Sequence, residues 1–198
     1  MTDMHSWVAA TLDRLADLLA GAGVEAWDAP SLCEQWRVRH VIAHVTMPVR
    51  LDSAQFGAAM AAAGGDFTVL SDTVAARDGS LPVDDLLDQL RSPRLHAWQP
   101  PGGGAAGALS HAVIHSLDVT IALGRPAVAP TRAVTTVLDQ LVAANGAWFG
   151  LDLADVRIEA TDTAWDWGRG QVVRTDSGSL LALLSGRTLP DGRRLPRA

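Results

Sequence analysis

Apolar residues recur every three or four positions in five long segments of the chain, a spacing typical of amphipathic helices. Glycine and proline separate the segments, most clearly at 100–104, where two prolines precede three glycines. Pro48 lies inside the second segment, and its missing N–H predicts a kink near His44. The predicted helices span 4–22, 38–63, 83–98, 105–123 and 131–148. The pattern at 66–80 leaves the local structure open.

The pattern changes after residue 149. Val156, Ile158 and Ala160 alternate with charged residues, which predicts a half-exposed strand. The other expected elements are a turn at 168–170, a return strand at 172–174 and a short apolar helix at 179–185. The sequence therefore predicts a mainly α protein, with a helical bundle at 1–149 and a small C-terminal α/β domain at 150–198.

The charge and the hydropathy of the chain exclude several classes of partner. The formal net charge is −6, and arginines cluster only in the last twelve residues, where prolines interrupt them, so we expect no nucleic-acid partner. No stretch of about 18 uncharged apolar residues predicts a membrane span. The N-terminus lacks the pattern of a signal peptide, and Cys33 is the sole cysteine, so we expect a cytoplasmic protein.

Histidines form the clearest chemical pattern. His111 and His115 are four residues apart on a predicted helix, so both imidazoles lie on one face, near enough to share a metal ion. Asp118 follows on that face and can orient His115 or become a ligand itself. His44, from another helix, would complete three ligands and leave positions open for water or substrate. His40 can replace or supplement one of these ligands. The structural alternative for all of these histidines is that they are buried and bond to carbonyl groups.

Two stretches carry a family resemblance. Residues 32–44, LCEQWRVRHVIAH, resemble the L-C-x-x-W-x-V-R-D-V-V-A-H signature of the mycothiol-dependent maleylpyruvate isomerase family. Residues 111–124, HAVIHSLDVTIALG, resemble its second signature, E-x-x-x-H-x-x-D-x-x-x-A-x-G, and the tail at 160–187 is similar to its small C-terminal domain. The resemblance implies a DinB-like four-helix bundle with a C-terminal appendage. The lysine-free composition fits a GC-rich, actinobacterial source.

The resemblance also implies a set of metal ligands. In that family the last histidine of the first signature and the glutamate and histidine of the second hold the metal, which by position are His44, His111 and His115. This chain departs from the family at His111, where glutamate is usual, and at His40, where aspartate is usual. Three imidazoles suit zinc best, with nickel, copper or iron as alternatives.

The implied chemistry is the activation of a thiol, mycothiol, for addition to a small electrophilic substrate in an S-transfer or an isomerisation. Asp118 would act beside the metal, while Arg39 and Arg187, both in matched motifs, would contact carboxylates of the thiol or the substrate. Salt bridges or helix caps are the structural alternative for both arginines. For Cys33 and Trp36 we expect packing roles.

Two other functions stay open. The protein can be a metal-dependent hydrolase that uses a metal-bound water, or a catalytically degenerate protein of the same fold that binds a metal or a small molecule. The glutamate-to-histidine departure at His111 is the best support for the degenerate protein. The sequence leaves the substrate open, and a monomer and a homodimer are both compatible with it.

Overall fold

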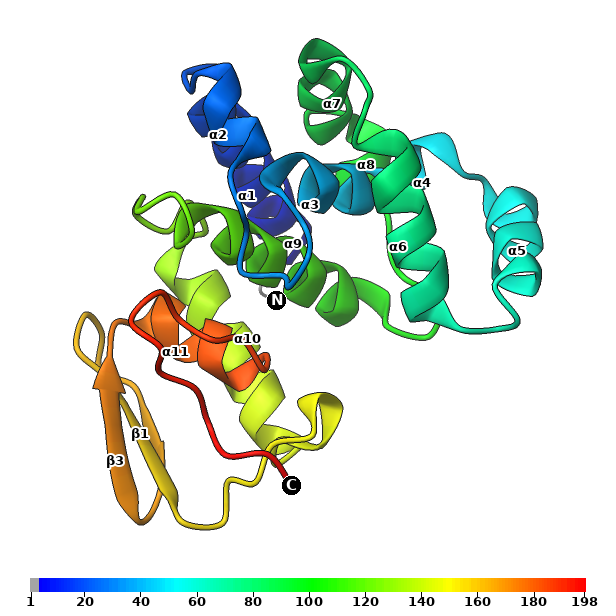
Figure 1. Cartoon of the computed structure of the whole chain (residues 1–198). Coiled ribbons are helices and arrows are strands. Elements are labelled where there is room, and N and C mark those ends of the chain that lie inside the picture. Colours follow the sequence, from blue (N-terminus) through cyan, green and yellow to red (C-terminus); the bar gives the residue numbers. More distant parts are fainter. Residues whose placement is uncertain (1–3) are drawn as a thin grey trace.

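The computed structural model describes residues 4–198 and confirms the predicted fold class, mainly helical with a small C-terminal α/β part (Figure 1). The helices of the first half are α1 (Met4–Ala20), α2 (Val24–Asp28), α3 (Val38–Val45), α4 (Met47–Arg50), α5 (Ser53–Ala62), α6 (Phe67–Asp78), α7 (Val83–Leu90) and α8 (Pro93–His96). The second half contains α9 (Gly104–Thr120), α10 (Thr131–Ala143), the 3-10 turn η1 (Ala147–Phe149), β1 (Val156–Ala160), β2 (Asp166–Gly168), β3 (Gln171–Thr175) and α11 (Ser177–Leu184).

The prediction of a single helix at 38–63 is wrong, because the structure divides this stretch into α3, α4 and α5. The break near His44 is larger than a kink: α3 ends at Val45, and Pro48 lies in the first turn of α4, where no intrahelical N–H is needed. Leu51 is extended, and Asp52 then caps α5 by accepting a hydrogen bond from the Gln55 N–H at 2.8 Å.

Two further helix predictions change at their boundaries. The segment predicted at 83–98 divides into α7 and α8, because Pro93 begins a new helix after Ser92. The segment predicted at 131–148 ends earlier, at Ala143. The open stretch at 66–80 contains α6, whose first N–H groups bond to the side chain of Asp66.

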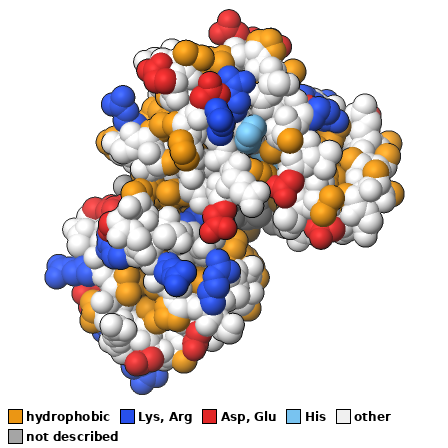
Figure 2. All heavy atoms as spheres, viewed as in Figure 1, with side chains coloured by type: hydrophobic (Ala, Val, Ile, Leu, Met, Phe, Trp, Pro, Cys, Tyr) orange, Lys and Arg blue, Asp and Glu red, His pale blue; other side chains and the backbone are white. Residues whose placement is uncertain are grey.

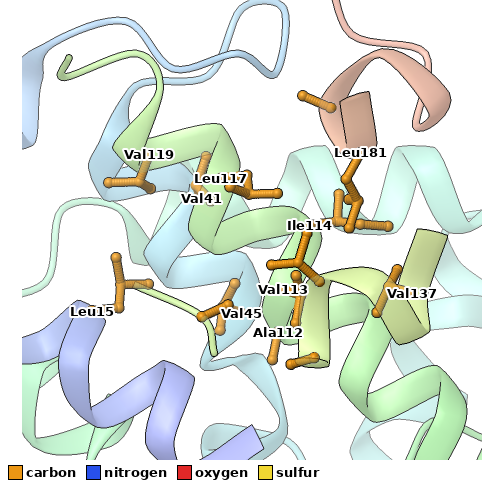
Figure 3. Close-up of a cluster of buried hydrophobic side chains, with 14 of the residues drawn as sticks. Leu15, Val41, Val45, Ala112, Val113, Ile114, Leu117, Val119, Val137 and Leu181 are labelled. Carbon is orange, nitrogen blue, oxygen red and sulfur yellow. The ribbon is translucent and has the colours of Figure 1, made fainter. Parts of the chain in front are cut away.

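Helix α9 lies at the centre of the core. It packs against α1, α3, α10 and α11, and Figure 3 shows its side chains Val113, Ile114 and Leu117 among those of neighbouring helices. Leu109 and Val113 are fully buried. A helix enclosed on several sides has few places for polar groups to meet water, so its histidines and its aspartate need partners inside the protein.

A smaller apolar cluster lies beside the main core. Met47, Leu70 and Val74 are buried in it, and Phe56 and Met60 of α5 pack against them. Every residue of α5 is at least partly exposed, and in Figure 1 this helix lies at the edge of the molecule, with apolar side chains at the surface of that lobe in Figure 2. Helix α5 is therefore held by few buried contacts.

The C-terminal sheet has the strand order β2-β1-β3. The segment expected as a return strand is β3, but it pairs with β1 in parallel, and β2 provides the antiparallel partner. The chain crosses the start of β1 between β2 and β3. A side chain at Gly168 would meet the carbonyl oxygen of Val156, and one at Gly170 would meet Asp155, so these two glycines permit the crossing.

The apolar core continues from the bundle into the C-terminal part. Ile158 of β1 and Leu180 and Leu181 of α11 are buried in the same cluster as Leu117 and Val137. The division of the chain at residue 149 stays a prediction. Between residues 4 and 198, no helix combines the length and the apolar character required to cross a membrane.

Candidate metal centre

The structure brings His44, His111 and His115 together. One ring nitrogen of each lies within 4.8 Å of the others, and the Nε2 atoms of His44 and His111 are 3.1 Å apart. The ring centroids are separated by 4.8–5.1 Å. The i,i+4 spacing places two rings on one side of α9, and the packing of α3 against α9 supplies the third.

Aromatic side chains surround the histidine cluster on one flank. The ring of Trp36 lies 5.1 Å and that of Phe67 6.1 Å from the ring of His44, measured between centroids. The ring of Trp98 lies 5.4 Å from that of His111. His44 is 4% exposed, and its Nδ1 atom has no hydrogen-bond partner among residues 4–198. A buried polar atom without a partner is costly, so it points to a missing ligand or a functional role.

The environment keeps two of the histidines neutral. Burial lowers the pKa of His44 to about 3, and the neighbouring side chains of His115 and Arg187 act in the same direction. Burial also lowers the pKa of His111 well below its usual value, and its two histidine neighbours lower it further. The neutral imidazole is the form that binds metal ions, so the site is prepared for coordination near neutral pH.

A hydrogen-bonded network forms the other flank and contacts the cluster through His115. Asp118, 1% exposed, accepts hydrogen bonds from His115 Nδ1 at 2.9 Å, from Arg187 Nε at 2.8 Å and Nη2 at 2.9 Å, and from Cys33 Sγ at 3.1 Å. The bond to Nδ1 leaves Nε2 of His115 as the atom that can face the cluster. Arg187 follows α11, and the backbone N–H of Leu32 donates to the Asp118 carbonyl at 3.0 Å. This flank therefore joins three distant segments of the chain.

Charge holds this network in its ionised form. Burial raises the pKa of Asp118, but the hydrogen bonds from Arg187 and His115 outweigh it and hold that pKa well below its usual range. Burial lowers the pKa of Arg187, yet the bonds and the charge of Asp118 raise it above its ordinary value. Burial, with the charge of Asp118, raises the pKa of the Cys33 thiol far above its usual value, so that the thiol stays protonated.

Other predicted residues lie away from the cluster. Arg39 forms an ion pair with Asp28 at 2.9 Å and donates to the Gly79 carbonyl at 2.7 Å, which is the structural role that the sequence left as its alternative. His40 Nδ1 accepts from the Arg37 N–H at 3.2 Å and caps α3. The sequence predicted a packing role for Cys33 but not the hydrogen bond that its thiol donates to Asp118. The position of Cys33 in the first signature was the only sequence signal that could have indicated this bond.

Two surface grooves flank the centre. A groove of about 370 Å³ lies on the aromatic flank, lined by Met47, Pro48, Leu51, Asp52, Ser53, Phe56, Arg94, Trp98, Gln99 and Pro101. A groove of about 420 Å³ lies on the other flank, lined by Ser31, Leu32, Cys33, Glu34, Gly186, Arg187, Thr188 and Arg197. The first is largely apolar. The second contains two guanidinium groups.

The fold and the site define a helical bundle in which imidazoles of two helices converge on one point, with an aspartate–arginine pair behind them. The chain belongs to the mycothiol maleylpyruvate isomerase family, because the model of that family's N-terminal domain matches residues 8–156. Two solved structures of the mycothiol-dependent maleylpyruvate isomerase, one a histidine-to-alanine mutant, share the fold, with TM-scores of 0.54 and 0.55. Each is 17% identical, and each alignment covers 99% of this chain and 95% of the other. No curated protein matches the chain.

Proposed function

We propose that this protein is a metal-dependent enzyme that activates mycothiol for S-transfer to, or isomerisation of, a small electrophilic substrate. The observation that carries the proposal is the convergence of His44, His111 and His115 within 4.8 Å. Family membership supports mycothiol as the thiol, because the matching model is that of the mycothiol maleylpyruvate isomerase N-terminal domain. We further propose that it acts in the cytoplasm, as a monomer or a homodimer.

The three histidines fit a divalent metal ion. Zinc–nitrogen bonds of 2.0–2.1 Å in a tetrahedral site put two ligand nitrogens about 3.3 Å apart. The 3.1 Å between Nε2 of His44 and Nε2 of His111 is close to that separation. Three neutral nitrogen donors favour zinc, with nickel, copper or iron as alternatives.

A bound metal ion would supply a Lewis acid that lowers the pKa of a thiol at its open position. The other tasks fall to the chain itself. Asp118 holds the His115 ring through Nδ1 and fixes which nitrogen is free. Arg187 keeps Asp118 ionised and, at the edge of the groove beside Cys33, can also hold a polar group of the thiol. In this proposal Asp118 and Arg187 are positioning residues, and Arg39 has no part.

The experiment measures metal content and thiol chemistry together. Purified protein loaded with zinc is expected to retain about one ion per chain by mass spectrometry of the metal and to conjugate mycothiol to electrophiles. His44→Ala is expected to lower metal affinity by more than the roughly 100-fold that loss of a supporting residue causes, because it removes a ligand. His111→Glu restores the ligand type usual in the family and is expected to keep the metal.

His5→Ala is the matched control for metal binding, since His5 bonds to Gln99 and is not one of the three clustered histidines. A protein that binds no metal, and in which His44→Ala changes nothing, would refute the proposal. Hydrolysis of an ester or amide without added thiol would favour the metal-dependent hydrolase. A bound metal without either reaction would favour the degenerate binding protein, for which the replacement of glutamate by His111 is the supporting observation.

A further inference from the structure

The groove on the aromatic flank has the properties of a small-molecule site. Met47, Leu51, Phe56 and Trp98 supply apolar walls, and its volume is about 370 Å³. Small-molecule sites are typically concave, mainly apolar and roughly 300–1,000 Å³ in volume. A cavity of about 150 Å³ holds one benzene ring, so this groove has room for an aromatic ring with substituents.

The groove shares a wall with the histidine cluster. Trp98 lines the groove, and its ring lies 5.4 Å from the ring of His111 in an edge-to-face arrangement. Met47, another lining residue, begins α4 three residues after His44. The break between α3 and α4 therefore places an apolar wall directly beyond a proposed metal ligand.

One charged group of the groove, Asp52, is bonded within the protein, and the other, Arg94, can bind a ligand. The Asp52 carboxylate is engaged as the cap of α5, where it accepts from the Gln55 N–H at 2.8 Å. Arg94 has one long hydrogen bond, from Nη2 to the Leu51 carbonyl at 3.4 Å. A guanidinium has five N–H donors, so Arg94 can donate to a carbonyl oxygen of a ligand.

We propose that this groove binds the apolar body of the electrophilic substrate, an aromatic carbonyl compound, beside Trp98. The inference rests on the proposed function, whose substrate class it specifies. Helix α5 contributes Ser53 and Phe56 to the wall of the groove, and each of its residues is at least partly exposed. A ligand in contact with Phe56 and Met47 would add apolar contacts that α5 lacks on its own.

The test uses benzylideneacetone as the probe and begins with metal-free full-length protein and no thiol, so that only binding is measured. Saturation-transfer NMR and calorimetry are expected to show one saturable site. Phe56→Asp is expected to weaken binding at least about tenfold, because it places a charge against the ligand. Phe56→Leu keeps an apolar side chain, and Val69→Asp introduces the same charge at an exposed apolar residue of α6 outside the groove; both are expected to change affinity less than about threefold.

A second arm links the groove to catalysis. With zinc and mycothiol present, Phe56→Asp is expected to lower kcat/KM for benzylideneacetone at least about tenfold, with the metal content unchanged. Absence of saturable binding up to about 1 mM, or equal affinity in Phe56→Asp, overturns the inference. Unchanged kcat/KM in Phe56→Asp overturns it too, as does self-association that this substitution abolishes, since a second copy would then cover the groove. Failure of the proposed function alone would remove the catalytic arm and leave the binding arm intact.

Discussion

The two flanks of the histidine cluster differ in how their polar groups are satisfied. On one flank, Asp118 is buried and bonds to His115, Arg187 and Cys33. On the other, Trp98 and other aromatic rings face the histidines, and Nδ1 of His44 lacks a hydrogen-bond partner within the described chain. The first flank fixes the position of an imidazole, while the second leaves space beside the cluster. One buried centre can thus be rigid toward the C-terminal part and accommodating toward α5.

The largest expected effect comes from breaking the rigid flank. Asp118→Ala is expected to lower the free energy of unfolding by about 3–5 kcal/mol, because it leaves the largely buried Arg187 guanidinium without its counter-charge. Urea denaturation of the metal-free protein measures this loss. Asp17→Ala, which removes an exposed ion pair with Arg91, is the control and is expected to cost less than about 1 kcal/mol. Equal losses in the two variants would mean that the flank is not rigid in the sense described.

The next largest effect is expected from acid pH, through the protonation of His44. His44 has a pKa of about 3 when folded and near 6.5 when unfolded, so the unfolded chain binds the proton first. The free energy of unfolding is therefore highest above about pH 6.5, and it decreases as the pH falls from 6.5 toward 3. At pH 5 the loss from His44 is about 2 kcal/mol relative to pH 7, and His111 shifts in the same direction.

Denaturation of metal-free protein at pH 7 and pH 5 checks this expectation. In His44→Leu the dependence on pH is expected to be weaker, because one titrating ring is gone. Asp118 does not account for the effect, since its depressed pKa matters only near and below its unfolded value of 3.8. Stability independent of pH between 7 and 5 would contradict the neutral, buried state of the rings.

A smaller effect is expected at Cys33. Cys33→Ala removes the S–H group that donates to Asp118 and is expected to cost about 1 kcal/mol, while Cys33→Ser keeps a donor. Because its pKa is raised, the native thiol is expected to react with iodoacetamide at pH 8 at least about tenfold more slowly than the thiol in urea. Equal rates in the folded and unfolded protein would show that Cys33 is not held in this network.

The smallest effect is expected at Arg39. Arg39→Gln breaks a partly exposed ion pair with Asp28 and is expected to change stability by less than about 1 kcal/mol, with metal affinity unchanged. Arg187→Gln, its counterpart on the rigid flank, is expected to reduce both stability and metal affinity, because Asp118 loses its partner. Metal titrations of both variants make this comparison, and a loss of metal in Arg39→Gln would restore the catalytic role first expected for it.

The sequence by itself determined the helical class and the alignment of His111 with His115. Both depend on local spacing, because apolar periodicity defines helices and a four-residue spacing places two side chains on one face. Only the resemblance of its motif to the family signature implied His44 as the third ligand, and the packing of α3 against α9 brought it to the other two. The sequence did not determine where the helix predicted at 38–63 breaks, because capping by Asp52 and burial of Met47 compete with the helical pattern.

Only the tertiary structure decided the parallel pairing of β1 with β3, the different partners of Arg39 and Arg187, and the apolar groove. Both arginines belong to matched motifs, yet one meets Asp28 and the other Asp118, because contacts between distant segments carry no signal in local spacing. The lowered pKa of His44 has the same origin, because the imidazole is removed from water only when α3 packs against α9.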